Sequence, residues 1–127
     1  NYHLDTSSVP DDKITRKIRE LRSLRSGFNI DVAVNYKMNE DKDNNKMSDQ
    51  SLASLKEQFT NGKGKRWLEN AVIWIYRRKF SYHELKRIVK FYKTSAGQKW
   101  ADGFPSIVLT SIMAYETIHK ELMKEIK

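Results

Sequence analysis

The segment 80–105, FSYHELKRIVKFYKTSAGQKWADGFP, constrains the fold most strongly, because it holds closely spaced signals for helix starts and stops. Ser81 and Glu84 have the spacing of a capping box, in which each side chain accepts a hydrogen bond from the other residue's backbone N–H. The helix that follows ends at a sharp break after Tyr92, and Thr94 can cap the next helix. The segment therefore predicts two consecutive helices that meet at a tight corner.

Four residues after the break refine this prediction. Gly97 lies in the first helical turn, where glycine costs roughly 1 kcal/mol relative to alanine, so we expect it to permit close approach to a neighbouring helix. Trp100 and Phe104 are expected to pin this short helix to the core. Pro105 favours the first turn of a helix. We therefore expect the short helix to stop before Pro105 and the last helix to run from there to about residue 125.

The rest of the chain also shows helical periodicity. Apolar side chains recur at steps of three and four residues, and the other expected helices cover residues 9–26, 30–38, 48–61 and 66–79. The β-branched residues of 30–38 also allow a strand there. Ser8 can cap the first helix and Gly27 can close it. The repeat in the last helix comprises Val108, Ile112, Tyr115, Leu122 and Ile126, with His119 in the same register.

These elements predict an all-α fold: a single compact bundle of five or six helices, with a short helix after the break at residues 94–97. The length of 127 residues suits one domain. We expect residues 1–8 to be frayed and residues 39–47 to form a polar loop. The chain has no cysteine, which excludes a disulfide framework and thiol catalysis. It also has no apolar run long enough to predict a transmembrane segment.

The net charge of +8 is concentrated in one segment. Residues 63–99 hold eleven Lys or Arg and two Glu, which gives +9. Four of these cations lie opposite the apolar stripe of the predicted helix 81–92 and form the candidate surface for an anionic partner: Lys86, Arg87, Lys90 and Lys93. Such a surface can bind nucleic acid, anionic lipid or an acidic glycan. The simpler interpretation, which we favour, is a solvated face that keeps a basic protein soluble.

No catalytic, cofactor or metal site can be assigned from the sequence. His83 and Glu84 begin like a zinc-protease helix, but Arg87 stands where the second histidine is required. His119 is in line with apolar residues, so we expect a half-buried packing histidine rather than a ligand or a catalyst. We therefore expect no enzyme activity, no cofactor and no metal.

The same segment resembles the signature of a bacterial family of all-helical domains of unknown function. The matching residues are Glu84-Leu85, then the run FYKTSAGQK at residues 91–99, then Pro105. The family commonly has Ser-Pro where this chain has Thr94-Ser95. Both versions keep a cap followed by a first helical turn. The resemblance implies a helical fold and export, and it supplies no catalytic residues.

We therefore expect an exported, non-enzymatic binding module of the bacterial envelope, with a periplasmic or secreted location. Its partner could be an envelope protein, a lipid or an acidic glycan. The alternative is a binder of nucleic acid or another anionic polymer that uses residues 63–99; nucleic acid is less favoured, because no nucleic-acid motif is present. The chain begins with Asn1 rather than Met, which is consistent either with removal of a signal peptide or with trimming.

Overall fold

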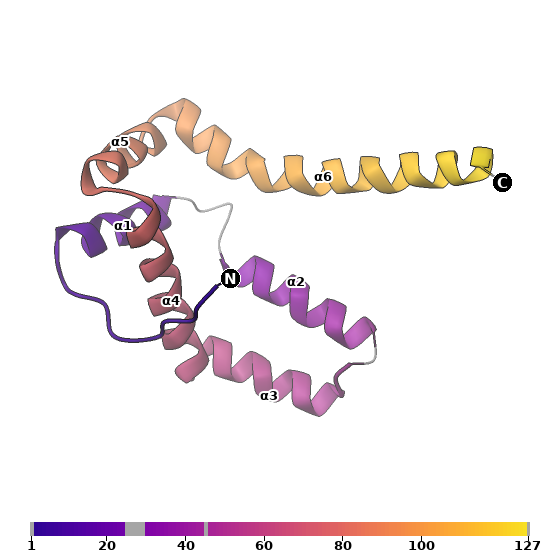
Figure 1. The fold of residues 1–127 in the computed structure, drawn as a ribbon, viewed down its shortest axis with the longest axis horizontal. Helices are drawn as coiled ribbons and strands as arrows, with labels where there is room; N and C mark the ends of the chain where they lie inside the picture. The colour runs from indigo at the N-terminus through magenta and orange to yellow at the C-terminus, as the bar shows by residue number, and fades with distance from the viewer. Residues whose placement is uncertain (1, 25–29, 45, 127) are drawn as a thin grey trace.

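The protein is predominantly helical. The computed structural model describes residues 2–24, 30–44 and 46–126, with the backbone alone for residues 30–33. These residues form six helices and no strand, so the predicted all-α class is confirmed. Figure 1 shows their arrangement. The helices are α1 (Lys13–Leu24), α2 (Ile30–Asp43), α3 (Asp49–Thr60), α4 (Lys63–Lys79), α5 (Tyr82–Tyr92) and α6 (Ser95–Ile126).

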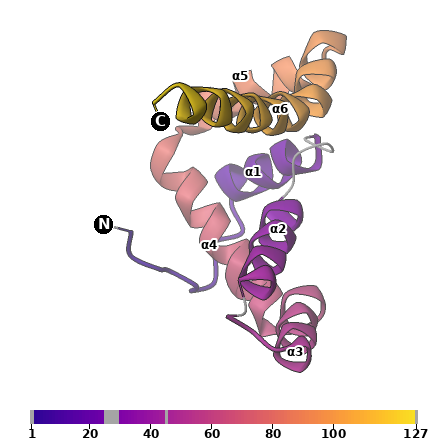
Figure 2. The ribbon, with the colours of Figure 1, turned by 90° about the vertical axis from the view of Figure 1, so that its right-hand side faces the viewer.

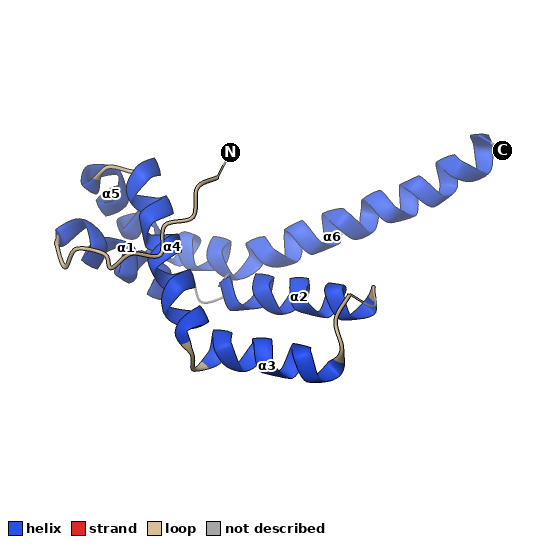
Figure 3. Ribbon diagram, turned by 60° about the horizontal axis from the view of Figure 1, so that its bottom comes forward, coloured by secondary structure: helices blue, strands red, loops and turns tan. Residues whose placement is uncertain are grey.

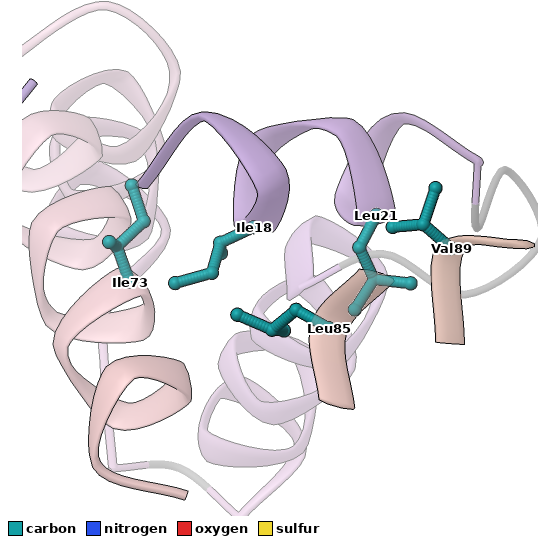
Figure 4. Packing of buried hydrophobic residues seen from close by; sticks show 5 residues of the cluster. All are labelled: Ile18, Leu21, Ile73, Leu85 and Val89. Carbon is teal, nitrogen blue, oxygen red and sulfur yellow. The ribbon is translucent and has the colours of Figure 1, made fainter. Parts of the chain in front are cut away.

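The centre of the core lies where α1, α4 and α5 meet (Figure 4). Ile18 and Leu21 come from α1, Ile73 from α4, and Leu85 and Val89 from α5, and none of the five side chains is more than 3% exposed. Burying an aliphatic side chain of this size stabilises the fold by about 1.5–3 kcal/mol. The predicted apolar stripe of the helix after the capping box is therefore a central part of the core.

The start of α1 differs from the prediction. Asp12, rather than Ser8, caps this helix, because its carboxylate accepts the backbone N–H of Thr15 at 2.9 Å. The predicted first turn, residues 9–12, is not helical. Arg77 of α4 binds the same carboxylate, and this long-range contact selects Asp12 over the earlier cap. Gly27, predicted to close the helix, lies outside the described residues.

The helices α2 and α3 form an antiparallel pair that is joined to the rest of the protein through α4 (Figure 3). Residues 30–38 are helical and not a strand. The helix continues to Asp43, so the first five residues of the predicted loop 39–47 are helical. Lys37 stabilises this extension through ion pairs one turn away, with Glu40 at 3.0 Å and Asp41 at 3.5 Å. The helix α3 starts where the sequence predicted, and Ser48 caps it by accepting the N–H of Ser51 at 3.1 Å.

The helix α4 begins at Lys63, three residues earlier than predicted. Gly64 explains the difference, because a side chain at this position would lie 3.0 Å from the carbonyl oxygen of Gln58 in α3. Glycine therefore lets α4 begin directly beside the end of α3. The helix then packs against both α1 and α3, and its buried residues are Ala71, Val72 and Ile73.

The N-terminal residues lie along α4, although the sequence predicted a frayed end. The indole N–H of Trp74 donates to the carbonyl of Ser7 at 3.0 Å, and the side-chain amide of Asn70 donates to the carbonyl of Thr6 at 3.2 Å. Asp5 forms an ion pair with Arg78 at 3.6 Å. The pKa of Asp5 lies below its ordinary value, chiefly because Ser7 donates hydrogen bonds to the carboxylate.

The predicted corner between α5 and α6 is confirmed in detail. Ser81 and Glu84 form the capping box, with backbone-to-side-chain distances of 2.8 and 3.2 Å. Thr94 caps α6 by accepting the N–H of Gly97 at 3.0 Å. A side chain on Gly97 would overlap the backbone carbonyl of Phe91 and lie 2.7 Å from the Cα of Tyr92. The close helix approach expected at Gly97 is therefore made by the end of α5.

One prediction about this region is wrong. The short helix and the last helix are a single helix, α6, and Pro105 lies inside it rather than at its start. A proline inside a helix removes one backbone hydrogen bond and favours a kink, and Figure 1 shows that α6 changes direction after its first turns. The ring centroids of Trp100 and Phe104 lie 5.0 Å apart in the turn that leads into the proline. Trp100 itself is 48% exposed and does not pin the helix into the core.

Candidate functional site

The C-terminal two thirds of α6 project away from the other helices (Figures 1 and 3). Every residue from 106 to 126 is exposed. We call these residues the arm. Figure 2 shows the arm viewed from its C-terminal end. Ten large apolar side chains of the arm are between 39% and 76% exposed: Ile107, Val108, Leu109, Ile112, Met113, Tyr115, Ile118, Leu122, Met123 and Ile126. An apolar surface of this extent indicates an interaction site.

Part of this surface continues the face that α6 buries in the core. Gly97 and Ala101 are buried in the first turns, and Ala101 is 2% exposed. Steps of three or four residues lead from Ala101 through Pro105 along one face of the helix to the end of the arm. We call the part of this face on the arm the seam: Val108, Ile112, Tyr115, His119, Leu122 and Ile126. The helix therefore carries one continuous apolar stripe, of which only the first turns are covered.

The opposite face of the arm is largely polar. Thr110, Thr117, Glu121 and Lys124 lie on it, away from the seam. The charged residues of the arm are three Glu and two Lys, which gives a net charge of −1 on an otherwise basic protein. The arm is thus amphipathic and does not belong to the basic part of the chain.

The sequence predicted a half-buried packing role for His119, and this prediction is wrong. It is exposed on the seam, and its ring centroid lies 5.8 Å from that of Tyr115 one turn earlier. The periodicity placed it correctly in line with apolar residues, but nothing in the rest of the described chain covers that line. Among the described residues, no group of three or more His, Asp or Glu could hold a metal ion.

The four cations of the candidate anionic surface are all exposed, three on α5 and Lys93 directly after its last residue, and they differ in their contacts. Lys93 forms an ion pair with Glu20 of α1 at 2.7 Å. Glu20 also forms an ion pair with Lys17 at 2.7 Å. The hydrogen bond from Lys17 has the largest effect in lowering the pKa of the Glu20 carboxyl, and the one from Lys93 follows. Lys93 therefore links α5 to α1, and its charge is matched within the fold.

The other three cations, Lys86, Arg87 and Lys90, have no ion pair with any described residue. The ammonium of Lys86 lies 5.6 Å from the ring centroid of Tyr82. The cations at the start of α4 do not extend this surface, because they lie at the end of α4 away from α5 (Figure 1). At the near end of α4, Arg77 and Arg78 are paired with aspartates. Of the four candidate cations, three therefore have no ion-pair partner among the described residues, and Lys13 of α1 lies beside them, with its ammonium 4.6 Å from the same Tyr82 ring.

An apolar hollow of about 440 Å³ lies between the N-terminal residues and α4. Its walls are almost wholly apolar, and they include Tyr2, Leu4, Phe59, Trp67 and Ile75. The ammonium of Lys63 lies 4.9 Å from the ring centroid of Trp67. The sequence did not predict this hollow, because residues 1–8 were expected to be frayed. The apolar residues at positions 2 and 4 were the only local signal for it.

The exposed seam was also missed, although its periodicity was recognised. A three-and-four repeat identifies which side chains share a face, but it does not reveal whether that face meets the same chain. The signal that could have indicated the seam was the length of the repeat, which continues far beyond the short segment needed to pack against α5.

None of the helices within the described residues is both long and apolar enough to cross a membrane. No curated protein and no solved structure matches the chain. Residues 68–125, from the first third of α4 almost to the end of the arm, match the model of a family described as "Uncharacterized protein conserved in bacteria (DUF2059)". This matched segment contains the capping box, the corner at Gly97 and nearly the whole arm, and it is similar to a bacterial family of uncharacterised function.

Proposed function

We propose that this protein is a helical binding module that binds a protein partner along the arm of α6. One observation carries the proposal: the apolar stripe of α6 is buried in its first turns and then continues, uncovered, to Ile126. An apolar face on a helix is stabilised when another surface covers it. An amphipathic helix that lies in an apolar groove or against another helix is a recurrent mode of protein recognition.

The titratable groups support a binding role rather than an enzymatic one. Catalytic groups often have shifted pKa values and lie in clefts. Within the described residues, each group with a shifted pKa either caps a helix or turn or takes part in an ion pair: Asp5, Asp12, Lys17, Glu20, Lys37 and Glu84. These groups have structural roles, so none of them is left as a candidate acid or base.

We also propose that the protein is exported and acts in the bacterial envelope or outside the cell. The support is the resemblance of the segment 84–105 to exported domains, together with the match to a bacterial family. The coding sequence upstream of Asn1 tests this proposal. A signal peptide there supports export, whereas a preceding intracellular domain contradicts it.

The binding role is tested with a charge placed on the seam and the same charge placed opposite it. The variant Ile112→Asp should lose the partner, and Thr117→Asp should keep it, because both positions are exposed but only Ile112 lies on the seam. The partner is captured by chemical cross-linking in the native host and identified by mass spectrometry. Equal cross-linked yield for wild type and Ile112→Asp overturns the proposed binding face.

A second candidate function is the binding of an anionic polymer such as nucleic acid or an acidic glycan. The observation that favours it is that Lys86, Arg87 and Lys90 are exposed on α5 without ion-pair partners among the described residues. Binding through these cations should weaken steeply as salt concentration rises.

The test for this second function uses two triple charge reversals. Replacing Lys86, Arg87 and Lys90 by Glu should abolish binding to heparin and to a DNA duplex. The matched control reverses Lys63, Lys65 and Arg66 at the far end of α4 and should keep more of the binding. Affinity that does not change with salt, or that survives the α5 reversal, eliminates this function.

A further inference from the structure

We propose that the partner of the arm is a second copy of this chain, with the two arms packed antiparallel along their seams. This inference rests on the proposed binding role of α6 and specifies the occupant. We call the helices α1–α5 and the first turns of α6 the body. The reasons are the spacing of the seam, the area and charge of the arm, and the position of the body beside the base of the arm.

The spacing of the seam matches a partner that is itself a straight helix. From Pro105 to Ile126 the steps along the seam alternate regularly between three and four residues. This is the repeat by which two helices pack side chains into each other along their full length. The arm spans 21 residues, or about 32 Å. A second arm has the same length and the same repeat, so the two surfaces match from end to end.

The area is sufficient for a specific but weak pair. Eight of the ten exposed apolar side chains lie on the seam or beside it; Ile107 and Met113 do not. A half-exposed side chain of this size presents an accessible surface of on the order of 80 Å². This is somewhat less than half the area that a large aromatic side chain can bury. The eight areas sum to roughly 600 Å² on each copy, the lower end of the range for specific interfaces. We therefore expect a dissociation constant of about 1–100 μM.

The charge of the arm favours a protein over a membrane surface. A helix that lies on an anionic bilayer combines its apolar face with Lys or Arg on the polar face. The arm has three Glu and two Lys, a net charge of −1, so anionic lipid does not attract it. The excess positive charge of this protein lies elsewhere, in residues 63–99.

The orientation follows from where the body lies. Gly97 and Ala101 are buried on the same face of α6 that becomes the seam, so the protein's own body occupies the seam side at the base of the arm. In a parallel pair, two bodies would have to occupy that side at the same level. In an antiparallel pair the bodies lie at opposite ends, and each arm ends where the partner's body begins.

An antiparallel pair centred near Thr117 brings together chemically matching layers. Val108 lies opposite the partner's Ile126, and Ile112 opposite the partner's Leu122. Tyr115 lies opposite the partner's His119, so two rings share the central layer. The flanking side chains also meet in apolar pairs, because Ile118 approaches the same residue of the partner. The one unfavourable approach is between the two Glu116 side chains, which lie near the twofold axis.

The first experiment measures oligomeric state by sedimentation velocity on the wild-type protein from 1 to 200 μM. We expect the wild type to shift from monomer to dimer within this range. Leu122→Asp should remain monomeric throughout, whereas Thr117→Asp, on the opposite face, should dimerise like the wild type. Glu116→Gln should lower the dissociation constant several-fold because it removes the like-charge approach.

These variants also separate failure of the dimer from failure to fold. All three positions are exposed on the arm, so circular dichroism of each variant should retain the wild-type melting transition of the body. A wild type that stays monomeric at 200 μM, or a dimer that tolerates Leu122→Asp, overturns the proposal. A monomer whose arm is still cross-linked to another protein in the host overturns the second copy as occupant but leaves the proposed binding role in place.

The second experiment tests the orientation and uses the absence of cysteine in the chain. Ile112→Cys and Leu122→Cys are prepared as separate variants, then oxidised alone and as a mixture. An antiparallel pair should give a disulfide-linked heterodimer in the mixture and little linked product from either variant alone. Linkage within each separate variant indicates a parallel pair and contradicts the proposed arrangement. Thr117→Cys, mixed with either variant, is the control for random oxidation.

Discussion

The guanidinium of Arg77 and the carboxylate of Asp12 form a two-pronged ion pair, with N–O distances of 2.8 and 3.1 Å. Arg77 also donates to the hydroxyl of Thr15 at 2.9 Å, and Thr15 is only 1% exposed. The same carboxylate caps α1. One arginine of α4 therefore holds the first turn of α1 in place, and bidentate pairs of this kind are among the stronger polar contacts in proteins.

This pair predicts a specific dependence of stability on pH. Hydrogen bonds from Arg77, and then from the Thr15 N–H, hold the pKa of Asp12 well below its ordinary value of 3.8. A carboxyl whose folded pKa is lowered stabilises the fold above its unfolded pKa, and the stabilisation is lost as pH falls below that value. Asp12→Asn should therefore lower the melting temperature at pH 7, and the difference from wild type should shrink between about pH 5 and pH 2.

The control for this prediction is the neighbouring carboxylate. Asp11 pairs with Arg16, and the Asp11 side chain is 92% exposed, so Asp11→Asn should follow the wild-type pH profile closely. Thermal melts of the three proteins across this pH range provide the measurement. If the gap between wild type and Asp12→Asn is the same at pH 7 and pH 2, the pair does not stabilise the fold through the ionised carboxylate.

The capping box predicts the effect of removing one hydroxyl. Ser81→Ala should lower the free energy of unfolding by about 1 kcal/mol, because the backbone N–H of Glu84 loses its acceptor at the start of α5. Urea denaturation measures the change. Ser54→Ala, at an exposed site within α3, is the matched control and should be neutral or slightly stabilising. Equal effects at the two sites are incompatible with a stabilising cap at Ser81.

Two glycines of α6 predict opposite effects of the same substitution. Gly97→Ala should destabilise the protein by about 1–3 kcal/mol, because the added methyl group overlaps the backbone at the end of α5. Gly103→Ala should stabilise it by roughly 0.5–1 kcal/mol, since nothing lies within 4 Å of a side chain there and alanine favours helix. Denaturation of both variants tests the close contact directly. A stabilising Gly97→Ala contradicts that contact.

The proline inside α6 predicts a stability gain on replacement. Pro105→Ala should raise the free energy of unfolding by about 1–3 kcal/mol, because it restores the backbone donor to the carbonyl of Ala101 and relieves the ring's clash. It should also straighten α6, which small-angle scattering can detect as a change in the maximum dimension. Ser106→Ala is the control and should change stability by a few tenths of a kcal/mol. A loss of stability in Pro105→Ala indicates that the bend itself is favourable.

Much of the helical architecture was predictable because its signals are local. The caps at Ser48, Ser81 and Thr94 involve donors and acceptors three residues apart, so the residue types and their spacing are sufficient. For α1, the local pattern predicted a cap at Ser8. The observed cap, Asp12, is held by Arg77, which lies 65 residues away in the sequence, and no local rule can include that contact.

The candidate sites were predicted less well, for a related reason. The four candidate cations are all exposed, but Lys93 is paired with Glu20 of α1, and this pairing depends on how α1 packs on α5. The arm was predicted as a helix with the correct apolar register. It was expected to pack within the bundle, whereas its residues are exposed. Pro105 was interpreted as a helix start because proline favours that position, whereas the helix continues through it.

The sequence by itself therefore determined the helices, most of their ends and the register of their apolar faces, because these depend on side chains within one or two turns of each other. Only the tertiary structure decided which faces are covered. The same apolar stripe of α6 is buried at Ala101 and exposed at Leu122, and the difference arises because α5 is short and ends beside the first turns of α6. Periodicity defines a face, but burial depends on what the rest of the chain, or a second chain, places against it.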